Sequence, residues 1–267
     1  MTAVAEPQSW RRPPLIQSRS LRWLLTGLVP AYLLVVLLTL DVPLARIAAG
    51  MPRAMEMAGA LLRPDFFSRA DAIWLGLKES LAMTFAATFL GFLLAIPFAF
   101  GAAANIAARP VYHFCRAVIA ISRSFQEIII AILFVAMLGF GPLAGLATLV
   151  FAGFGFIAKL AAEEIEAMPP ATLEAMRASG ASWGQQMVYG VWPFLLPRLT
   201  GITLYRLDIN FRESAVIGIV GAGGIGATLN TSLDRFEYNS AAAIIILIIG
   251  IVLMTEYLSQ WLRRRLR

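Results

Sequence analysis

Charged and polar side chains interrupt two long apolar stretches of this sequence, and their types and spacing could do chemistry. They are Arg123 and Glu127 in one stretch, and Arg206, Asp208, Asn210, Arg212 and Glu213 in the other. Guanidinium groups bind phosphate-type oxyanions through paired hydrogen bonds. The same side chains can instead pair with one another and hold helices in register. The sequence leaves both interpretations open: contact with an oxyanion, or ion pairing alone.

Helical spacing sorts these residues into balanced sets. One helix face would carry Arg206, Asn210 and Glu213, the nearly opposite face Asp208 and Arg212, and the earlier stretch the i,i+4 couple Arg123 and Glu127. The three arginines and the three carboxylates sum to zero charge. Net charge therefore does not by itself predict a path for an anion.

A glycine-rich segment follows the second stretch. Gly221, Gly223, Gly224 and Gly226 lie within a match to the G-x-G-x-x-G spacing of dinucleotide sites. That fingerprint requires a βαβ unit, whereas this segment follows a run of membrane-span length, so we expect no nucleotide here. The glycines are expected to break the helix and pack closely, since irregular backbone at membrane depth must be buried or line a cavity.

Residues for catalysis and metal binding are scarce. His113 is the only histidine and Cys115 the only cysteine, which excludes an internal disulfide and a multi-cysteine metal site. A G-x-x-x-x-G-K-[ST] loop for ATP phosphates does not occur in the sequence. We therefore predict a chain that is not an enzyme and that holds no metal or cofactor.

Composition predicts a membrane environment. Of the 267 residues, 59% are hydrophobic and 14% charged, and the mean hydropathy is +0.75. A soluble domain carries about 25% charged residues, so polar surface is too scarce here for a water-soluble fold. The net charge of +6 does not indicate nucleic-acid binding, because most arginines flank apolar runs instead of forming one basic face.

Apolar runs of about 20 residues predict the elements that position the charged residues. The expected fold is all-α, with six membrane-spanning helices at 23–40, 80–104, from near Ala117 to the turn 139–142, 142–158, 193–220 and 241–262. The first run exceeds the roughly 7–15 residues of a signal-peptide core, so we expect it to remain as a helix. Arginine clusters before the first run and after the last predict that both chain ends are cytoplasmic.

The longest predicted cytoplasmic loop, 159–193, has signals for ordered structure. A proline pair at 169–170 ends the preceding helix, and Gly180 ends the short helix that follows. Ser182 and Gln185 then form a capping box that opens a second short helix. The loop is either a surface hairpin that links two spans or a rigid element that docks into a partner.

This loop resembles the EAA loop of ABC import permeases. The likeness is carried by Glu174, Ala175, Met176, Gly180 and Pro193, with methionine where a second alanine is usual. In that family the loop forms a coupling helix that sits in a cleft of the ATPase subunit. The resemblance therefore implies that these residues transmit movement between an ATPase and the membrane helices.

Further segments resemble the phosphonate-transport permease family, in order and with compatible spacing, from about residue 65 to the C-terminus. They are 79–84, 95–97, 123–125, 139–142, 204–206, 210–212 and 220–226. Gln126 stands where a proline is expected, and Asp208 where a glutamate is expected. Relatives in this family are thought to move phosphonates, phosphite or phosphate. The implied path passes the charged residues at 123–127 and 206–213, and the glycines at 221–226 would gate it.

The resemblance also implies a set of partners. A five-helix permease domain would occupy 65–267, after an N-terminal part, 1–64, with the first membrane helix and an outer linker. Two ABC-type ATPase subunits would bind ATP and Mg, and a substrate-binding protein would deliver the oxyanion. The permease would work in the bacterial inner membrane as a pair, with another copy or with a similar chain. The alternative is an ion-gradient-driven anion carrier, which would not need the ordered loop.

Overall fold

Helices make up nearly all of the part of the protein that the structure describes. The computed structural model describes residues 18–39 and 44–265, and the described residues form helices joined by short connections, with no strand among them. This is the all-α fold class expected from the sequence. The chain divides into two units, Met1–Met55 and Glu56–Arg267.

The first unit contains α1 (Arg19–Thr39) and the greater part of α2 (Leu44–Leu61). The helix α1 is apolar and buries none of its side chains, which is typical of a helix surrounded by lipid. In α2 the exposed side chains of Ile47, Met51 and Met55 follow one another at four-residue steps and therefore share one face.

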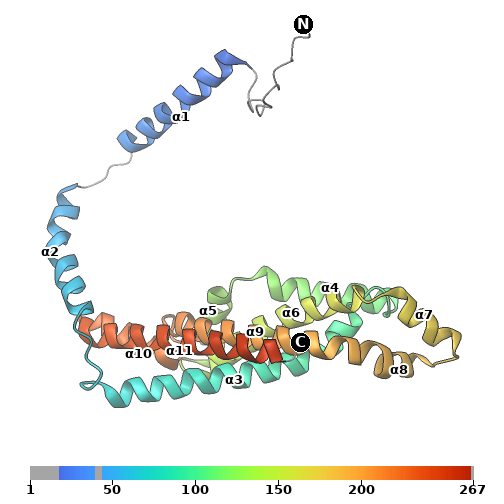
Figure 1. Ribbon diagram of the computed structural model, residues 1–267. Helices are drawn as coiled ribbons and strands as arrows, with labels where there is room; N and C mark the ends of the chain where they lie inside the picture. The colour runs from blue at the N-terminus through green and yellow to red at the C-terminus, as the bar shows by residue number, and fades with distance from the viewer. Residues whose placement is uncertain (1–17, 40–43, 266–267) are drawn as a thin grey trace, which may run out of the picture. The chain divides into compact units, whose positions relative to one another are not determined.

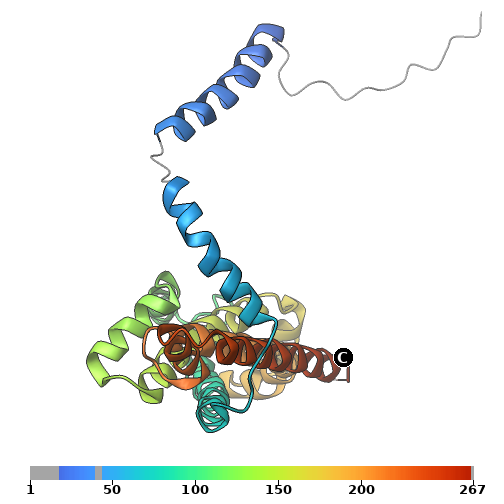
Figure 2. The same ribbon diagram turned by 90° about the vertical axis from the view of Figure 1, so that its left-hand side faces the viewer.

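The second unit is a bundle arranged around two long helices, α3 (Ala70–Gly101) and α6 (Pro142–Glu166), which pack along each other. The helices that also contact α6 are α4 (Arg109–Ser124), α5 (Glu127–Leu138) and α9 (Trp192–Gly218). The remaining long elements are α10 (Gly224–Asp234), which rests on α3 and α9, and α11 (Tyr238–Arg265), which packs on α9 and α10. Figure 1 shows this bundle from the side, and Figure 2 shows it from its α10 end.

The connection between α6 and α9 lies at the end of the bundle opposite α10 (Figure 1). It consists of α7 (Pro170–Ala178), α8 (Trp183–Gln185) and a π-helix (Gln186–Val191) that runs directly into α9. Helices of the π type are rare and occur mostly as single turns, frequently at functional sites. Trp183 also donates a hydrogen bond from Nε1 to the carbonyl oxygen of Ile106 at 3.3 Å, which joins this connection to the one between α3 and α4.

Small side chains explain the close packing of α6 in the bundle. Its buried residues include Gly145, Ala152, Gly153, Ala158 and Ala162. In lipid the hydrophobic effect does not drive helices together, so association relies on dispersion contacts between backbones that approach closely. A small-residue face lets α6 occupy the centre of the bundle.

Four of the described helices are long and apolar enough to cross a membrane: α1, α3, α6 and the Tyr238–Trp261 part of α11. The pair α4 and α5 provides a fifth candidate, which is bent by 91°. The helix α9 corresponds to the predicted span 193–220. It is not among these candidate spans, because charged residues are spread along its length. The turn 139–142 separates α5 from α6 as predicted, whereas α3 begins at Ala70 and not near residue 80. A total of six spans stays a prediction.

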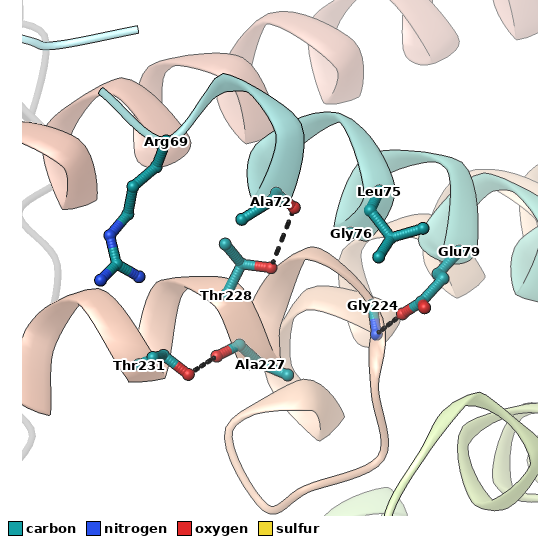
Figure 3. A pocket seen from close by; sticks show the side chains of 9 residues that line it. All are labelled: Arg69, Ala72, Leu75, Gly76, Glu79, Gly224, Ala227, Thr228 and Thr231. Carbon is teal, nitrogen blue, oxygen red and sulfur yellow. Dashed lines mark hydrogen bonds between the residues drawn. The ribbon is translucent and has the colours of Figure 1, made fainter. Parts of the chain in front are cut away.

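Two side chains of α3 hold the N-terminus of α10. Glu79 accepts a hydrogen bond from the Gly224 N–H at 3.0 Å, and Ser80 accepts one from the Ile225 N–H at 2.9 Å (Figure 3 shows the first). The first N–H groups of a helix lack partners within the helix and carry partial positive charge, so a carboxylate is favourable there. These bonds fix the glycine segment 221–226 against α3.

The contact between α9 and α10 depends on Gly226. A Cβ atom at this position would overlap the carbonyl oxygen of Ala215 and lie 3.0 Å from Cα of Gly218. We predict that Gly226→Ala destabilises the purified protein by about 1–3 kcal/mol, because backbone atoms must move apart. The measurement is the thermal unfolding midpoint in detergent. Gly250→Ala is the control, since nothing lies within 4 Å of a Cβ at Gly250. Equal midpoints for both variants would contradict the packing described here.

Candidate functional site

A buried guanidinium forms the centre of a charged cluster. The Arg206 side chain is 3% exposed, and its Nη2 lies 3.0 Å from Oε1 of Glu127 on α5. The ring of Phe156 on α6 lies 5.5 Å from the same guanidinium, which adds a cation–π contact. Arg206 is near the middle of α9 and Phe156 is near the middle of α6. The cluster therefore lies about halfway along the long helices.

The chain between α4 and α5 leaves the helical conformation beside this cluster. Residues 125–126 have extended backbone, and the two helices meet at 91°. The i,i+4 couple predicted for Arg123 and Glu127 is therefore wrong: the break turns Glu127 toward Arg206. Arg123 stays exposed, with its guanidinium 5.9 Å from the Phe156 ring. Two arginines from different helices thus share one aromatic ring.

Glu213 belongs to the same cluster. The sequence predicted that Glu213 shares one helix face with Arg206 and Asn210. In the structure the Glu213 carboxyl lies next to that of Glu127, and the neighbouring cations are Arg206 and Arg212. Arg206 thus lies near two carboxylates, that of Glu127 on α5 and that of Glu213 on its own helix, α9.

The opposite face of α9 carries a second ion pair. Arg212 Nη2 lies 3.4 Å from Asp208 Oδ2, in the i,i+4 geometry expected from the sequence. Thr255 of α11 donates a hydrogen bond to Oδ1 of Asp208 at 3.1 Å. Asp208 is buried, whereas the Arg212 side chain is 54% exposed. The pair joins α9 to α11 and leaves a cation at the surface of the chain.

Several buried polar atoms near the middle of the helices have no hydrogen-bond partner among the described residues. They are Arg206 Nε, Glu127 Oε2, Asn210 Oδ1 and Thr84 Oγ1. Asn210 is fully buried and donates from Nδ2 to Thr88 Oγ1 at 2.9 Å. Buried polar groups are normally satisfied, so unsatisfied groups at one depth indicate where water or a polar ligand is accommodated.

The glycine segment breaks the helix between α9 and α10. Gly221, Gly223 and Gly224 have φ values of 92°, 75° and 75°, which residues with a Cβ atom rarely adopt. The Gly141 N–H donates a hydrogen bond to the Gly221 carbonyl oxygen at 3.0 Å, which joins this segment to the turn between α5 and α6. Because the described residues contain no strand, the glycine spacing has no βαβ unit to form a dinucleotide site.

The helix α7 presents one face outward. Glu174 and Ala175 are exposed, and Gly180 after the helix has a φ of 80°. Met176 points to the other side, where a Cβ atom on Gly190 would lie 2.6 Å from its sulfur. The methionine found in place of the usual alanine is therefore a packing residue beneath α7, and the missing side chain at Gly190 makes room for it.

The capping box predicted at Ser182 is present. Ser182 Oγ accepts a hydrogen bond from the Gln185 N–H at 3.5 Å, and Gln185 Oε1 accepts one from the Ser182 N–H at 2.8 Å. The helix that it opens is not a separate short helix, because the π-helix continues it into α9, with Pro193 in the first turn of α9. The spacing Gly180–Gly184 matches G-x-S-x-G, but Ser182 caps a helix and follows no described strand, unlike a hydrolase nucleophile.

Comparison with known proteins identifies the family. Residues 87–267 match the family model described as binding-protein-dependent transport system inner membrane component. The chain belongs to this family. It is a multi-pass membrane permease, in agreement with its four or five apolar spans among the described residues.

Two curated relatives resemble the permease over most of its length. The phosphate-import permease protein PhnE of Mycolicibacterium smegmatis (strain ATCC 700084 / mc(2)155) is 38% identical over 207 residues, which are 77% of this chain and 39% of that protein. The phosphite transport system permease protein PtxC of Stutzerimonas stutzeri is 37% identical over 220 residues, or 82% of this chain and 79% of that protein. The permease thus spans well under half of the first relative and most of the second.

Solved structures show the same fold. An inward-facing structure of the MetNI methionine ABC transporter superposes with a TM-score of 0.64 at 25% identity, over 74% of this chain and 98% of that chain. A bacterial alginate ABC transporter in complex with an alginate pentasaccharide-bound periplasmic protein superposes with a TM-score of 0.61 at 17% identity, over 92% and 96% of the two chains. The second likeness concerns the fold alone.

The buried pair predicts a measurable coupling in the permease. Arg206→Met should destabilise it by on the order of 3 kcal/mol, because Glu127 is left without its counter-charge. The double variant Arg206→Met/Glu127→Gln should regain part of that loss, as measured by thermal unfolding in a double-mutant cycle.

The control for this cycle is the exposed pair Lys159 and Glu163, which lie 3.6 Å apart on α6. Its coupling energy should be only about 0.3–0.5 kcal/mol. A coupling energy for Arg206 and Glu127 no larger than that of the control would show that the buried pair does not hold α5 against α9.

Proposed function

We propose that the permease lines half of the path of an ATP-driven importer for phosphorus oxyanions, namely phosphonate, phosphite or phosphate. The substrate class is supported by the sequence likeness to phosphonate-transport permeases and by the names of the phosphate-import and phosphite relatives. The observation that carries the proposal is the broken helix at 125–126, with two guanidinium groups beside it.

The break indicates which surface faces the path. Backbone outside a helix at membrane depth must be buried in protein or line a water-filled cavity, because lipid offers no hydrogen bonds. Residues 123–126 are exposed on this chain. A second permease across a shared aqueous path would satisfy them, and that permease is another copy of this chain or a similar one.

The guanidinium groups suit an oxyanion that has to leave again. Arg123 is exposed beside the break, and Arg206 keeps its Nε free of hydrogen bonds among the described residues. A guanidinium binds phosphate-type oxygens well and is weakly hydrated. Glu127 already neutralises Arg206, so the oxyanion is held briefly and not trapped, as transport requires. Arg123 is the principal contact of the oxyanion, and Arg206, which lines the path, is a second contact.

The proposed source of energy is a pair of ABC-type ATPases, which bind ATP and Mg. The exposed face of α7, with Glu174, Ala175 and Gly180, enters a groove of the ATPase on the cytoplasmic side. Movement of α7 passes through Met176 and Gly190 into the π-helix and then into α9. This assignment puts the α7 end of the bundle in the cytoplasm and the α10 end outside, where a substrate-binding protein delivers its ligand.

Arg123 provides the test of the path. We predict that Arg123→Gln lowers uptake of radiolabelled phosphite, phosphate or methylphosphonate at least tenfold in vesicles that hold the complete transporter, while its thermal stability is unchanged. Arg109→Gln is the matched control, since Arg109 is an exposed arginine at the start of the same helix. Equal uptake by both variants would remove Arg123 from the path.

The α7 surface provides the test of ATP coupling. Glu174→Lys and Gly180→Trp should uncouple ATP hydrolysis from uptake without changing the amount of folded permease, because both alter the exposed face of α7 or its end. Glu163→Lys, an exposed change on α6 at the same end of the bundle, should remain coupled. Uptake that survives ATP depletion and stops when the ion gradient collapses would instead establish a gradient-driven carrier.

A further inference from the structure

Two glycines in one turn of α6 leave room for arginine side chains of the neighbouring helices. At Gly153, a Cβ atom would lie 3.3 Å from Nε of Arg206 on α9. At Gly155, a Cβ atom would overlap the Ser122 hydroxyl and lie 3.5 Å from Cγ of Arg123 on α4. The small residues therefore let α4 and α9 bring both arginines against the same part of α6.

The last turn of α4 is fixed on this part of α6. Ser122 is buried, and its hydroxyl donates a hydrogen bond to the carbonyl oxygen of Phe151 at 2.7 Å. Arg123 is the next residue, and α4 ends at Ser124. The backbone of Arg123 is thereby held against α6, but a long arginine side chain still has many rotamers. A contact at the far end of the side chain is needed to orient its guanidinium.

Phe156, half-buried on α6, supplies that contact. The centre of its ring lies 5.9 Å from Cζ of Arg123 and 5.5 Å from Cζ of Arg206. Both distances are within the roughly 6 Å over which a ring attracts a cation. The ring of Tyr205 on α9 lies 6.0 Å from that of Phe156. Phe156 is therefore itself held from α9 while it contacts an arginine of α4.

Arg123 differs from other arginines that lie over aromatic rings. Arg116 and Arg198 each contact a ring, and each also forms an ion pair with a glutamate. Arg123 takes part in none of the ion pairs between described residues. The contact that the structure gives its guanidinium is the ring of Phe156.

A ring and a carboxylate hold a guanidinium in different ways. A carboxylate occupies N–H donors at the edge of the group and cancels its charge. An aromatic ring attracts the cation through the negative face of its quadrupole, so the N–H donors stay available and the group stays positive. A guanidinium held by a ring alone is therefore oriented and still able to bind the oxygens of a phosphate-type anion.

We propose that Phe156 is a positioning residue of the oxyanion site, which orients the Arg123 guanidinium into the path without neutralising it. The inference rests on the proposed function, in which Arg123 contacts the oxyanion. Phe156 does not have to touch the anion, because it acts by restricting the rotamers of Arg123 before the anion arrives. Such preorganisation lowers the entropy that binding costs. The same ring also sets how far the Arg123 guanidinium lies from that of Arg206.

The first test weakens the attraction of the ring for cations and keeps its size nearly constant. Phenylalanine analogues with increasing numbers of ring fluorines would replace Phe156 in the complete transporter, reconstituted in vesicles. Uptake of radiolabelled phosphite, phosphate or methylphosphonate should fall stepwise, to a total loss of about two- to fivefold, which matches an exposed cation–π contact. A flat series would overturn the proposal.

Phe154 provides the matched control for this series. It lies on the same helix, its ring packs against Phe98 at 4.9 Å, and it takes part in none of the described cation–π contacts. The same analogues at Phe154 should leave uptake unchanged. A loss at Phe154 equal to that at Phe156 would assign the effect to packing of α6 and overturn the proposal.

The second test asks whether the ring acts through Arg123. The loss caused by the fluorinated ring should disappear in the Arg123→Gln background, because the guanidinium that Phe156 orients is gone. An equal loss in that background would overturn the proposal. Phe156→Tyr keeps the ring face and should retain uptake, whereas Phe156→Leu, which is apolar but has no ring, should lose at least as much as the fluorinated forms.

The Arg123→Gln variant also separates this proposal from the proposed function. If it lowers uptake while the fluorine series at Phe156 stays flat, Arg123 remains in the path and only the role of Phe156 is overturned. Full uptake by Arg123→Gln would instead contradict the proposed function, and the role of Phe156 with it.

Discussion

The counter-charge of Arg206 constrains the centre of the molecule. A guanidinium buried among the helices of a membrane protein is tolerated only with a partner nearby. Glu127 reaches Arg206 because the chain between α4 and α5 leaves the helix at 125–126. Gly153 leaves space for the same side chain, since a Cβ atom there would lie 3.3 Å from Arg206 Nε. A straight helix in place of α4 and α5 would point Glu127 elsewhere, so the bend and the ion pair require each other.

The helical path from Trp183 to Gly218 connects the two ends of the bundle without interruption. At one end it is attached to α7 through Met176 and Gly190, and at the other it stops where glycines with positive φ begin α10. The π-helix is the one irregular turn along the described part of this path. In the proposed function, this rod carries movement between the ATPase side and the outer gate, with Arg206 placed midway.

Features formed by residues close together in the sequence were predicted correctly. The capping box at Ser182, the positive φ of Gly180 and the pair of Asp208 with Arg212 each involve residues within four positions, so sequence spacing was enough. The partners of Glu127 and Glu79 lie 79 and 145 residues away, and no periodic pattern specifies them. The bend at 125–126 was missed because the apolar runs on either side of it, 117–121 and 128–138, together have the length of one span. Gln126 in place of an expected proline marks the position.

The balance of charge in the cluster has an electrical consequence. Arg123, Arg206 and Arg212 are matched by Glu127, Asp208 and Glu213, so α4, α5 and α9 carry no net charge from these residues when they move together. A membrane potential acts with about 2.3 kcal/mol per elementary charge per 100 mV. Its effects on these six residues therefore cancel when they move together. In the proposed function, the charge of the anion then crosses the voltage in the step in which the anion itself moves.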